Sequence, residues 1–219
     1  MRKRLIIAAL ISVLPLWPLR RLAYRWLLGY RIDPGSRIAA LTVLAAAEVE
    51  MTGARIGPFN LLRPHRLELR EGSLIGRYNR MSGIRLVSCG PKAIILHSNL
   101  IGGTWGRPQL KTGREDLVLG ARSQLTIKAF VDLNDRVVFG EDVVAGGVGS
   151  QFWTHGFDHK RNRISGPITI ADRVFVGSAS IVLPNVSICT DVTIGAGTNV
   201  HRSITEPGLY VSSELVRKT

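Results

Sequence analysis

The aliphatic residues between positions 170 and 200 recur with a period of six. Large aliphatic side chains follow one another at that spacing without a break: Ile170, Val176, Val182, Ile188, Ile194 and Val200. Smaller or β-branched residues stand two positions before each of them: Ile168, Val174, Ser180, Val186, Val192 and Thr198. An α-helix requires a period of 3.6 and a single strand a period of 2. Because six residues are three strand alternations, the pattern predicts short strands that turn and restart, as in a parallel β-helix of hexapeptide repeats.

The same spacing runs through most of the chain. It starts at Ile32, continues with slips of one residue to Met81, and returns at Leu119. Two polar stretches interrupt it, near residues 103–116 and near residues 146–166. Glycine-rich polar stretches between periodic segments are typical of loops, so we expect both to leave the coil.

This pattern divides the chain into three parts. Residues 32–205 are expected to form the β-helix, which makes the fold class all-β. Residues 1–31 precede it as a helical segment, and residues 206–219 follow it as a C-terminal tail in which the repeat has stopped.

The N-terminal segment has a different pattern. Apolar residues run from Leu5 to Leu19, with Pro15 and Pro18 in the second half of the run. This run is shorter than the roughly 20 apolar residues of a membrane-spanning helix, and prolines break or kink a helix. From Leu19 onward the apolar residues follow one face of an amphipathic helix, which we expect to end at Gly29.

Positive charge is concentrated in the same segment. The chain has 29 Lys and Arg residues against 16 Asp and Glu, a formal net charge of +13. Positions 1–31 contain no acid and seven basic residues: Arg2, Lys3, Arg4, Arg20, Arg21, Arg25 and Arg31. No nucleic-acid-binding motif accompanies the charge, so a nucleic-acid partner is not expected. A cationic amphipathic helix with Trp and Tyr is typical of a membrane interface, although a helix that caps the open end of the solenoid is a compatible interpretation.

The composition agrees with a solenoid core. Hydrophobic residues make up 45% of the chain but aromatic residues only 6%, as expected for stacked Ile, Val and Leu. The two cysteines, Cys89 and Cys189, provide neither a disulfide framework nor the spacing of a metal site. We therefore expect a reducing compartment and no bound metal.

The interruption near residues 146–166 contains the side chains best suited to chemistry. A solenoid that interrupts itself with charged and aromatic residues usually carries its site there. His155 lies in this stretch, and imidazole titrates near neutral pH, which suits a base that removes a hydroxyl proton. We therefore predict that His155 is a general base. Trp153 is a candidate for stacking on a sugar ring or for packing under the loop.

A histidine base needs an acceptor on its other ring nitrogen. Asp158 is a candidate in the same loop, and Asn134 and Asp132 are candidates from the preceding coil. A backbone carbonyl is a further alternative, and the sequence does not choose among them. Backbone amides of the Gly146-Gly147 turn are candidate donors to an oxyanion.

The segment from Thr154 to Thr205 resembles the hexapeptide-repeat acyltransferases, in particular the branch of maltose, galactoside and polysaccharide O-acetyltransferases. The residues that carry the resemblance are Thr154-His155, Gly166-Pro167-Ile168-Thr169-Ile170, Val174-Phe175-Val176-Gly177, Ile181-Val182-Leu183-Pro184 and Ile194-Gly195-Ala196-Gly197-Thr198-Asn199-Val200. The resemblance implies a left-handed β-helix, a homotrimer with sites between subunits, and a histidine at the Thr-His position as the base. It also implies direct transfer of the acetyl group from acetyl-CoA, without a metal.

The donor site is likewise implied by the resemblance. In the family, coenzyme A lies along the coils and its pantetheine arm passes small residues, which allow close approach to the backbone. The matching positions and the nearby basic residues are Gly177, Ser178, Ala179, Gly195, Ala196, Arg217 and Lys218. The chain departs from the family pattern at Phe175, where Trp is usual, and at Asn185, where Gly is usual. The Gly-Asn-Pro-Ala turn is replaced by Val211-Ser212-Ser213-Glu214, which bears on the contacts to the coenzyme A tail.

The expected function is therefore O-acetyl transfer from acetyl-CoA to a sugar hydroxyl of a polysaccharide or lipid-linked glycan. Because acetyl-CoA is cytosolic and residues 1–31 favour a membrane surface, we expect a cytoplasmic protein, peripheral on the inner face of the cell membrane. One alternative is a non-catalytic β-helix scaffold that has lost the coenzyme A site. A metal-dependent lyase of the carbonic anhydrase type would need three histidines on neighbouring coils, and the spacing of the five histidines does not provide them.

Overall fold

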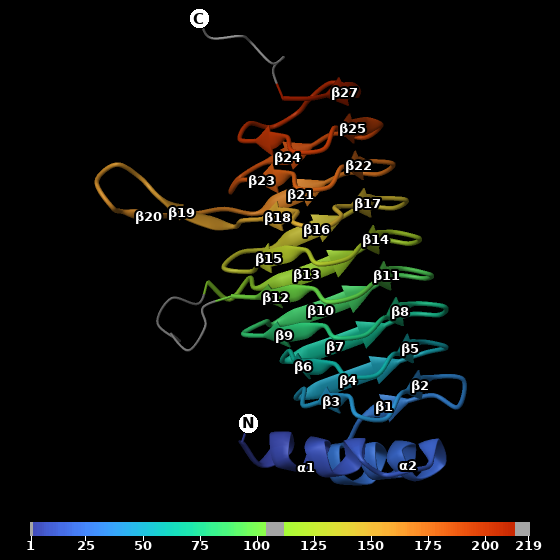
Figure 1. The fold of residues 1–219 in the computed structure, drawn as a ribbon. Helices are drawn as coiled ribbons and strands as arrows, with labels where there is room; N and C mark the ends of the chain where they lie inside the picture. Colours follow the sequence, from blue (N-terminus) through green and yellow to red (C-terminus); the bar gives the residue numbers. More distant parts are fainter. Residues whose placement is uncertain (1, 104–111, 213–219) are drawn as a thin grey trace, which may run out of the picture.

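The chain forms a left-handed parallel β-helix, as expected from the repeat. The computed structural model describes residues 2–103 and 112–212, and Figure 1 shows their coils stacked in one column. Eight coils of the described residues each contribute one strand to each of three long parallel sheets, here named A, B and C. Two helices lie at one end of the column, and one antiparallel hairpin projects from its side (Figure 1).

The strands are short, and those of one sheet stack in register from coil to coil. Sheet A contains, in stacking order, β1 (Arg31–Ile32), β4 (Glu48–Met51), β7 (Arg66–Leu69), β10 (Leu86–Cys89), β13 (Asp116–Leu119), β16 (Val137–Phe139), β21 (Ile168–Ile170) and β24 (Ser187–Ile188). Sheet B contains β2 (Arg37–Ile38), β5 (Arg55–Ile56), β8 (Leu74–Ile75), β11 (Ile94–Ile95), β14 (Gln124–Leu125), β17 (Val144–Ala145), β22 (Phe175–Val176), β25 (Val192–Ile194) and β27 (Gly208–Tyr210). Sheet C contains β3 (Val43–Leu44), β6 (Leu61–Arg63), β9 (Arg80–Ser82), β12 (Leu100–Gly102), β15 (Phe130–Asp132), β18 (Gln151–Phe152), β23 (Ile181–Val182) and β26 (Asn199–Val200).

The period-six residues form the core, as predicted. All six aliphatic residues from Ile170 to Val200 are at most 5% exposed, and the residues two positions before them are buried as well. Each buried side chain therefore stacks on its equivalent in the next coil, which is how a solenoid builds one continuous hydrophobic core. The strand β27 was not expected, because the tail after Thr205 lacks the repeat; it pairs with β25 and extends sheet B.

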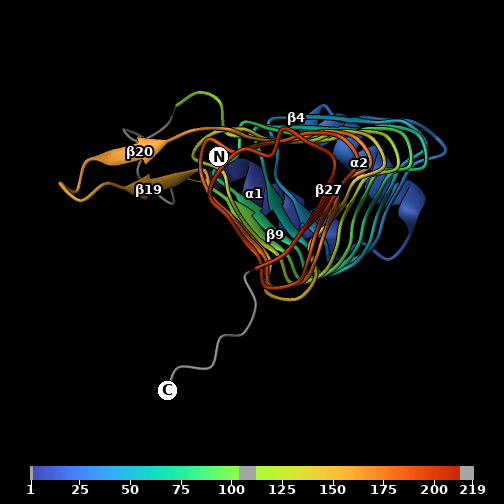
Figure 2. The same ribbon diagram turned by 90° about the horizontal axis from the view of Figure 1, so that it is seen from above.

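Most of the slips in the period arise at one corner of the triangular coil. Glu48 pairs with Arg66, 18 residues later, whereas Arg66 pairs with Leu86, 20 residues later. One of the two extra residues lies where the chain passes from sheet C to sheet A, here named the C–A corner, and the other lies between sheets A and B. A further residue is inserted between β17 and β18, where the chain passes from sheet B to sheet C. The second polar stretch leaves the column at the C–A corner, between β18 and β21, whereas residues 104–111 of the first, between β12 and β13, lie outside the described residues. Figure 2, which looks down the column, shows the hairpin projecting from this corner.

The second polar stretch is only partly a loop, which corrects the prediction for residues 146–166. Gln151 and Phe152 form β18 and keep their place between β15 and β23, with Phe152 fully buried. The Phe152 ring packs edge-to-face on Phe139 at a centroid distance of 5.4 Å. Only the segment after β18 leaves the coil, as the antiparallel hairpin of β19 (His155–Phe157) and β20 (Arg163–Ser165).

A column of buried asparagines supports the corner between sheets B and C in the lower coils. Asn60, Asn79 and Asn99 lie in successive coils and are at most 3% exposed. The Asn79 side-chain oxygen accepts hydrogen bonds from the backbone and side-chain amides of Asn99, both at 3.0 Å. Its side-chain amide donates to Asn60 Oδ1 at 3.1 Å and to the Leu96 carbonyl at 2.8 Å. Each coil is therefore tied to the next through one side chain.

Replacing Asn79 with alanine should destabilise the protein by about 2–4 kcal/mol, because it leaves several buried polar groups without partners. Urea unfolding followed by circular dichroism measures this loss. Asn199→Ala is the matched control, since Asn199 is exposed, and its midpoint should stay close to the wild-type value. Equal midpoints for the two variants would show that the asparagine column adds no stability.

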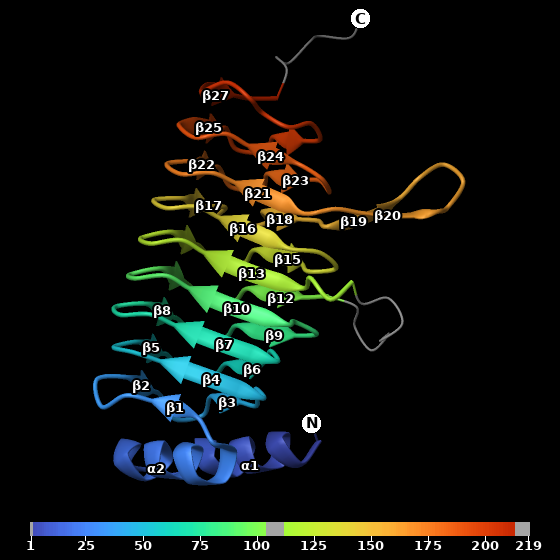
Figure 3. The ribbon, with the colours of Figure 1, turned by 180° about the vertical axis from the view of Figure 1, so that it is seen from behind.

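The N-terminal segment forms a layer of two helices across the first coil. Helix α1 (Arg2–Ser12) packs on β3, and α2 (Trp17–Leu28) packs on α1, β1 and β2. Helix α2 ends at Gly29 as predicted: Gly29 has a φ of 71°, and its amide and that of Tyr30 bond back to the last turn. Neither helix of the described residues has the length and apolar character needed to cross a bilayer. The layer lies flat across the end of the column (Figure 3).

The two cysteines have different surroundings, which gives a simple test of the packing. Cys89 is fully buried in β10, and burial raises the pKa of its thiol to about 12, whereas Cys189 is half-buried. Only a thiolate reacts rapidly with thiol reagents. We therefore expect one thiol per native chain to react with an aromatic disulfide reagent at pH 8, and both after denaturation. Two rapidly reacting thiols in the native protein would contradict the packing at β10.

Candidate active site

The C–A corner brings residues from two successive coils together. Asp132 is the last residue of β15, and Asn134 follows it in the turn toward sheet A. One coil above, His155 opens the hairpin just after β18. Because β15 and β18 pair in register, the turns that follow them lie one above the other. Stacking alone therefore places a carboxylate beneath the imidazole.

The Asp132 carboxylate binds the His155 ring. His155 Nδ1 lies 2.8 Å from Asp132 Oδ2. The Asp132 side chain is 3% exposed and that of His155 is 25% exposed. Because a carboxylate only accepts, Nδ1 must carry the proton that it donates, which leaves Nε2 of a neutral imidazole as the acceptor. This arrangement fixes the tautomer and the ring orientation that a general base requires.

Thr154 holds the Asp132 turn in place. Its hydroxyl accepts hydrogen bonds from the Asn134 amide at 2.8 Å and the Asp135 amide at 3.0 Å. The same hydroxyl lies within donating distance of Asp132, and the Thr154 amide donates to Asp132 Oδ2 at 3.1 Å. Thr154 is fully buried, so these groups have little access to water. Thr154 thus positions the Asp132 carboxylate that binds the ring of the neighbouring His155.

Asn134 binds the other oxygen of the Asp132 carboxylate. Its side-chain amide donates to Asp132 Oδ1 at 2.5 Å, and its side-chain oxygen accepts from Arg163 at 2.7 Å. The bond from Arg163 fixes which end of the Asn134 amide faces Asp132. Asn134 Nδ2 also lies 2.9 Å from His155 Nδ1, but both nitrogens donate to the carboxylate. Asn134 therefore orients Asp132 and does not itself accept the His155 proton.

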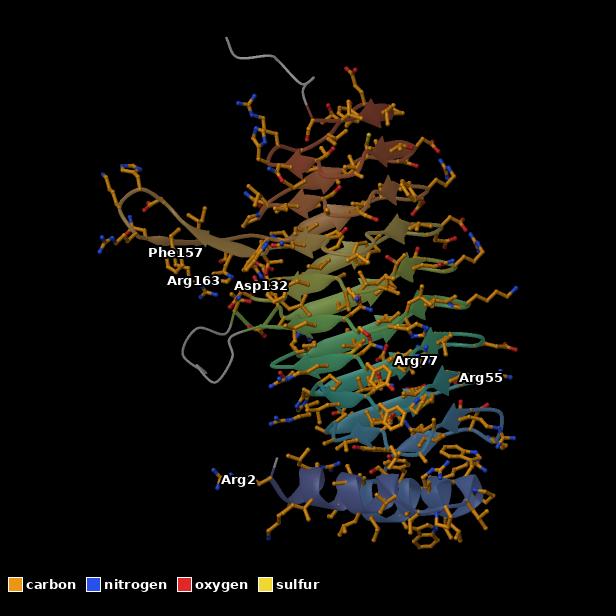
Figure 4. All side chains as sticks on the ribbon, in the orientation of Figure 1. Arg2, Arg55, Arg77, Asp132, Phe157 and Arg163 are labelled. Atoms are coloured by element: carbon orange, nitrogen blue, oxygen red, sulfur yellow. The ribbon has the colours of Figure 1, made fainter. Side chains whose placement is uncertain are left out.

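Two aromatic rings lie near the imidazole. The Trp153 ring lies 6.1 Å from the His155 ring, tilted by 58°, and the Phe157 ring lies at the same distance in an edge-on arrangement. Trp153 also packs on Phe130 at 4.7 Å and donates its indole N–H to Gln151 at 2.8 Å. Phe157 is 66% exposed, so its ring is available to a ligand. Figure 4 shows Phe157, Arg163 and Asp132 on the same side of the column, beside the hairpin.

Asp158 does not take part in this cluster. It lies in the hairpin turn, where Oδ1 accepts from the amides of Lys160 and Asn162, both at 2.8 Å. The Asn162 side chain donates to Oδ2 at 3.0 Å, and these hydrogen bonds lower the pKa of the Asp158 carboxyl below its usual range. Asp158 therefore stabilises the turn, and the acceptor for His155 is Asp132. Arg163 was not predicted; it could have been found only by knowing that β20 returns beside β19.

The residues assigned to the donor lie at another corner. Gly177, Ser178 and Ala179 follow β22, and Gly195 and Ala196 follow β25, so both groups lie where the chain passes from sheet B to sheet C. A Cβ on Gly177 would come within 2.6 Å of the Ala196 amide nitrogen, so coil stacking alone already requires glycine there. Within one chain the width of sheet C separates this B–C corner from His155. Arg217 and Lys218 lie outside the described residues.

The Gly146-Gly147 turn is not suited to bind an oxyanion. It lies at the B–C corner, the Gly146 amide donates to the Val176 carbonyl at 2.9 Å, and the Gly147 amide donates to Ser150 Oγ at 3.1 Å. Both backbone amides therefore already donate hydrogen bonds within the coil. Within residues 2–103 and 112–212, no three His, Cys, Asp or Glu side chains are grouped as ligands for a metal ion.

Comparison with known proteins gives one short match in sequence and several in structure. No family model matches the chain. A segment of 47 residues is 49% identical to UDP-3-O-acylglucosamine N-acyltransferase from Bordetella avium (strain 197N), and covers 22% of this chain and 13% of that protein. The chain thus spans only a small part of the curated relative that it matches.

Three solved acetyltransferases are similar to the chain at low identity. The first, a hexapeptide-repeat acetyltransferase from Vibrio cholerae O1 biovar eltor solved with acetyl coenzyme A, is 18% identical, with 60% of this chain and 66% of that chain covered and a TM-score of 0.42. The polySia-specific acetyltransferase NeuO is 16% identical, with 85% and 77% covered and a TM-score of 0.48. A maltose O-acetyltransferase from Clostridium difficile 630 is 13% identical, with 96% and 80% covered and a TM-score of 0.37. The four proteins named here are acyl- or acetyltransferases.

Proposed function

We propose that this protein is an O-acetyltransferase that transfers the acetyl group of acetyl-CoA to a sugar hydroxyl, with His155 as the general base. The observation that carries the proposal is the buried Asp132 carboxylate on His155 Nδ1, at 2.8 Å. A solenoid core needs no carboxylate, and a buried one is costly unless it has partners. Here the partners are the base itself and two groups, Thr154 and Asn134, that fix its position.

The chemistry follows from this geometry. His155 Nε2 takes the proton of the acceptor hydroxyl as the oxygen attacks the thioester carbonyl carbon. The tetrahedral intermediate then collapses, the carbon–sulfur bond breaks, and the imidazolium returns the proton to the departing thiolate. Asp132 stabilises the imidazolium between the two steps and prevents the ring from turning. The products are the acetyl ester and free coenzyme A.

The acceptor side favours a carbohydrate. The aromatic rings of Trp153 and Phe157 both lie 6.1 Å from the imidazole, and flat apolar surfaces beside a polar group suit the apolar face of a sugar ring. Two of the similar solved proteins carry polySia or maltose in their names. We propose a polysaccharide or a lipid-linked glycan as the acceptor class.

The donor side favours an assembly of subunits. The small residues at Gly177–Ala179 and Gly195–Ala196 are separated from His155 by the width of sheet C. A homotrimer with parallel solenoids would let coenzyme A lie between the B–C corner of one subunit and the C–A corner of the next. The proposed location is the cytoplasmic face of the cell membrane, where acetyl-CoA is available and the basic helical segment meets lipid.

A panel of acceptors tests the proposal. The full chain is incubated with acetyl-CoA and with maltose, N-acetylglucosamine, glucosamine and a sialic acid oligomer, and the products are analysed by mass spectrometry. An acetyl ester on a hydroxyl supports the proposal. Because the 47-residue match is to an N-acyltransferase, acetylation of the glucosamine amine alone would instead support an N-acyltransferase. Turnover of none of these sugars by a protein that also fails to bind acetyl-CoA would favour a non-catalytic scaffold.

A further inference from the structure

The helix layer exposes large apolar side chains, whereas a helical cap surrounded by water would bury them against the coils. Its exposed side, here named the outer face, includes eight large apolar residues that are 47% to 81% exposed: Ile6, Leu10, Val13, Leu16, Leu19, Leu22, Trp26 and Leu27. Figures 1 and 3 show that none of the described residues covers this side of the layer. A cluster of large exposed apolar side chains marks an interaction site in soluble proteins.

The inner side of α2 is more polar than the outer face. Arg20, Tyr24 and Leu28 recur every four residues and are buried against the first coil. Arg20 donates to the carbonyls of Leu14 at 2.5 Å and of Pro15 at 3.2 Å. It thus provides hydrogen-bond donors for the backbone that links α1 to α2. A helix whose outer side met only water would bury its apolar face and expose its arginine. The reversed arrangement requires an apolar partner for Leu22 and Trp26.

The charges around the outer face point to the chemistry of that partner. Arg2, Lys3 and Arg25 are exposed on the helix layer, and residues 2–32 contain no acidic residue that could neutralise them. Figure 4 places Arg2 at the end of the layer. An apolar face with exposed tryptophan and a basic rim matches the interface of a bilayer that contains anionic lipid, where each basic residue adds attraction. A second copy of the chain would bring two positively charged layers face to face.

We infer that the helix layer is a membrane foot: its outer face inserts into the interface of an anionic phospholipid bilayer, and the solenoid stands upright on it. The upright orientation follows from the flat position of the layer across the end of the column (Figures 1 and 3). This inference concerns a different surface from the transfer site and holds whether or not the proposed activity is correct.

One consequence does rest on the proposed function. In sheet C, β15 lies four strands above β3, and neighbouring strands are about 4.8 Å apart, so the site stands about 20 Å above the first coil. The reacting hydroxyl would then have to reach that height above the lipid. This favours an extended saccharide over a sugar attached directly to a lipid headgroup.

Vesicle flotation tests the foot without acetyl-CoA or an acceptor. The full chain is mixed with vesicles of phosphatidylcholine alone or with about one-third phosphatidylglycerol. We expect binding to the anionic vesicles, a decrease at high salt, and quenching of the protein's tryptophan fluorescence by brominated lipid chains that is weaker in Trp26→Gln. The double variant Leu22→Gln and Trp26→Gln should weaken binding at least about tenfold, because it removes two large side chains from the interface.

Matched variants distinguish binding through the helix layer from non-specific binding to vesicles. Leu209→Gln changes an exposed apolar residue at the other end of the column and should leave binding unchanged. Arg25→Gln should weaken binding to anionic vesicles, whereas Arg202→Gln, exposed near the opposite end, should have little effect. Equal binding by all variants would overturn the inference. So would absence of binding in a protein whose mass in solution doubles through the outer face, since that would identify a second copy as the partner.

Energy transfer tests the upright orientation. In a Cys189→Ser background, single cysteines replace Arg37 in β2 and His159 in the hairpin turn, and each is labelled with a donor dye. Transfer to an acceptor dye in the vesicle surface should be clearly more efficient from position 37 than from position 159. Equal transfer from the two positions would mean that the solenoid lies along the membrane and would contradict the inference.

Discussion

His155→Ala is expected to lower the rate of acetyl transfer by about two to four orders of magnitude, the usual contribution of a positioned general base. The physical reason is that the acceptor hydroxyl is a weak nucleophile, and that no other described group near the Asp132 carboxylate can take its proton. Acetyl-CoA binding should be retained, because the side chain is not among the small residues assigned to the donor. The measurement is the steady-state rate with saturating acetyl-CoA, together with a calorimetric titration of the donor.

His159→Ala is the matched control for this variant. His159 lies in the turn of the same hairpin and is exposed, so its removal tests the effect of altering the hairpin without altering the base. Its rate should stay within about twofold of the wild-type rate, as for an exposed side chain with no role. Near-normal turnover by His155→Ala, in a preparation with the wild-type melting temperature, would remove His155 from the mechanism.

Asp132→Asn is expected to reduce the rate by about two to four orders of magnitude while keeping the shape of the corner. An asparagine can turn its amide toward His155 Nδ1, and the imidazole then carries its proton on Nε2, where it cannot act as a base. The imidazolium that forms during transfer would also lose the nearby negative charge. The loss should therefore appear mainly in kcat, and the KM for acetyl-CoA should change little.

The control for Asp132→Asn is the same substitution at Asp158. That carboxylate bonds only within the hairpin turn, so its replacement should affect the stability of the turn and leave the rate almost unchanged. The reverse outcome, with loss of activity in Asp158→Asn and not in Asp132→Asn, would mean that the hairpin moves onto the imidazole during catalysis.

The fold could be predicted from the sequence because a solenoid repeats one local rule. Each period-six aliphatic residue from Ile170 to Val200 is buried in an equivalent place in its coil. A wrong assignment at one position therefore does not change the predicted architecture. The strand in the C-terminal tail was not predicted, because the tail does not follow the repeat. The strand at Gly208–Tyr210 pairs through backbone groups with β25, and its side chains need not follow the repeat.

The sequence could not single out Asp132 among the candidate partners of His155, because the choice depends on the stacking of two irregular turns. Asp158 is three residues from His155 in sequence and Asp132 is 23 residues away, yet the in-register pairing of β15 and β18 brings only Asp132 to the ring. The number of residues inserted at the C–A corner decides this, and the period alone does not reveal it. The burial of Arg20 was also unforeseen, because its partners are the carbonyls of the link after α1.

Binding of acetyl-CoA to the purified full chain is the measurement that tests the central claim most directly, because it requires no knowledge of the acceptor. Calorimetry should show saturable binding of about one molecule per chain in the micromolar range, retained in His155→Ala. Absence of binding in a folded protein of the expected assembly size would contradict the account. It would mean that the chain has the β-helix and the His155 cluster but does not bind the acetyl-CoA on which acetyl transfer depends.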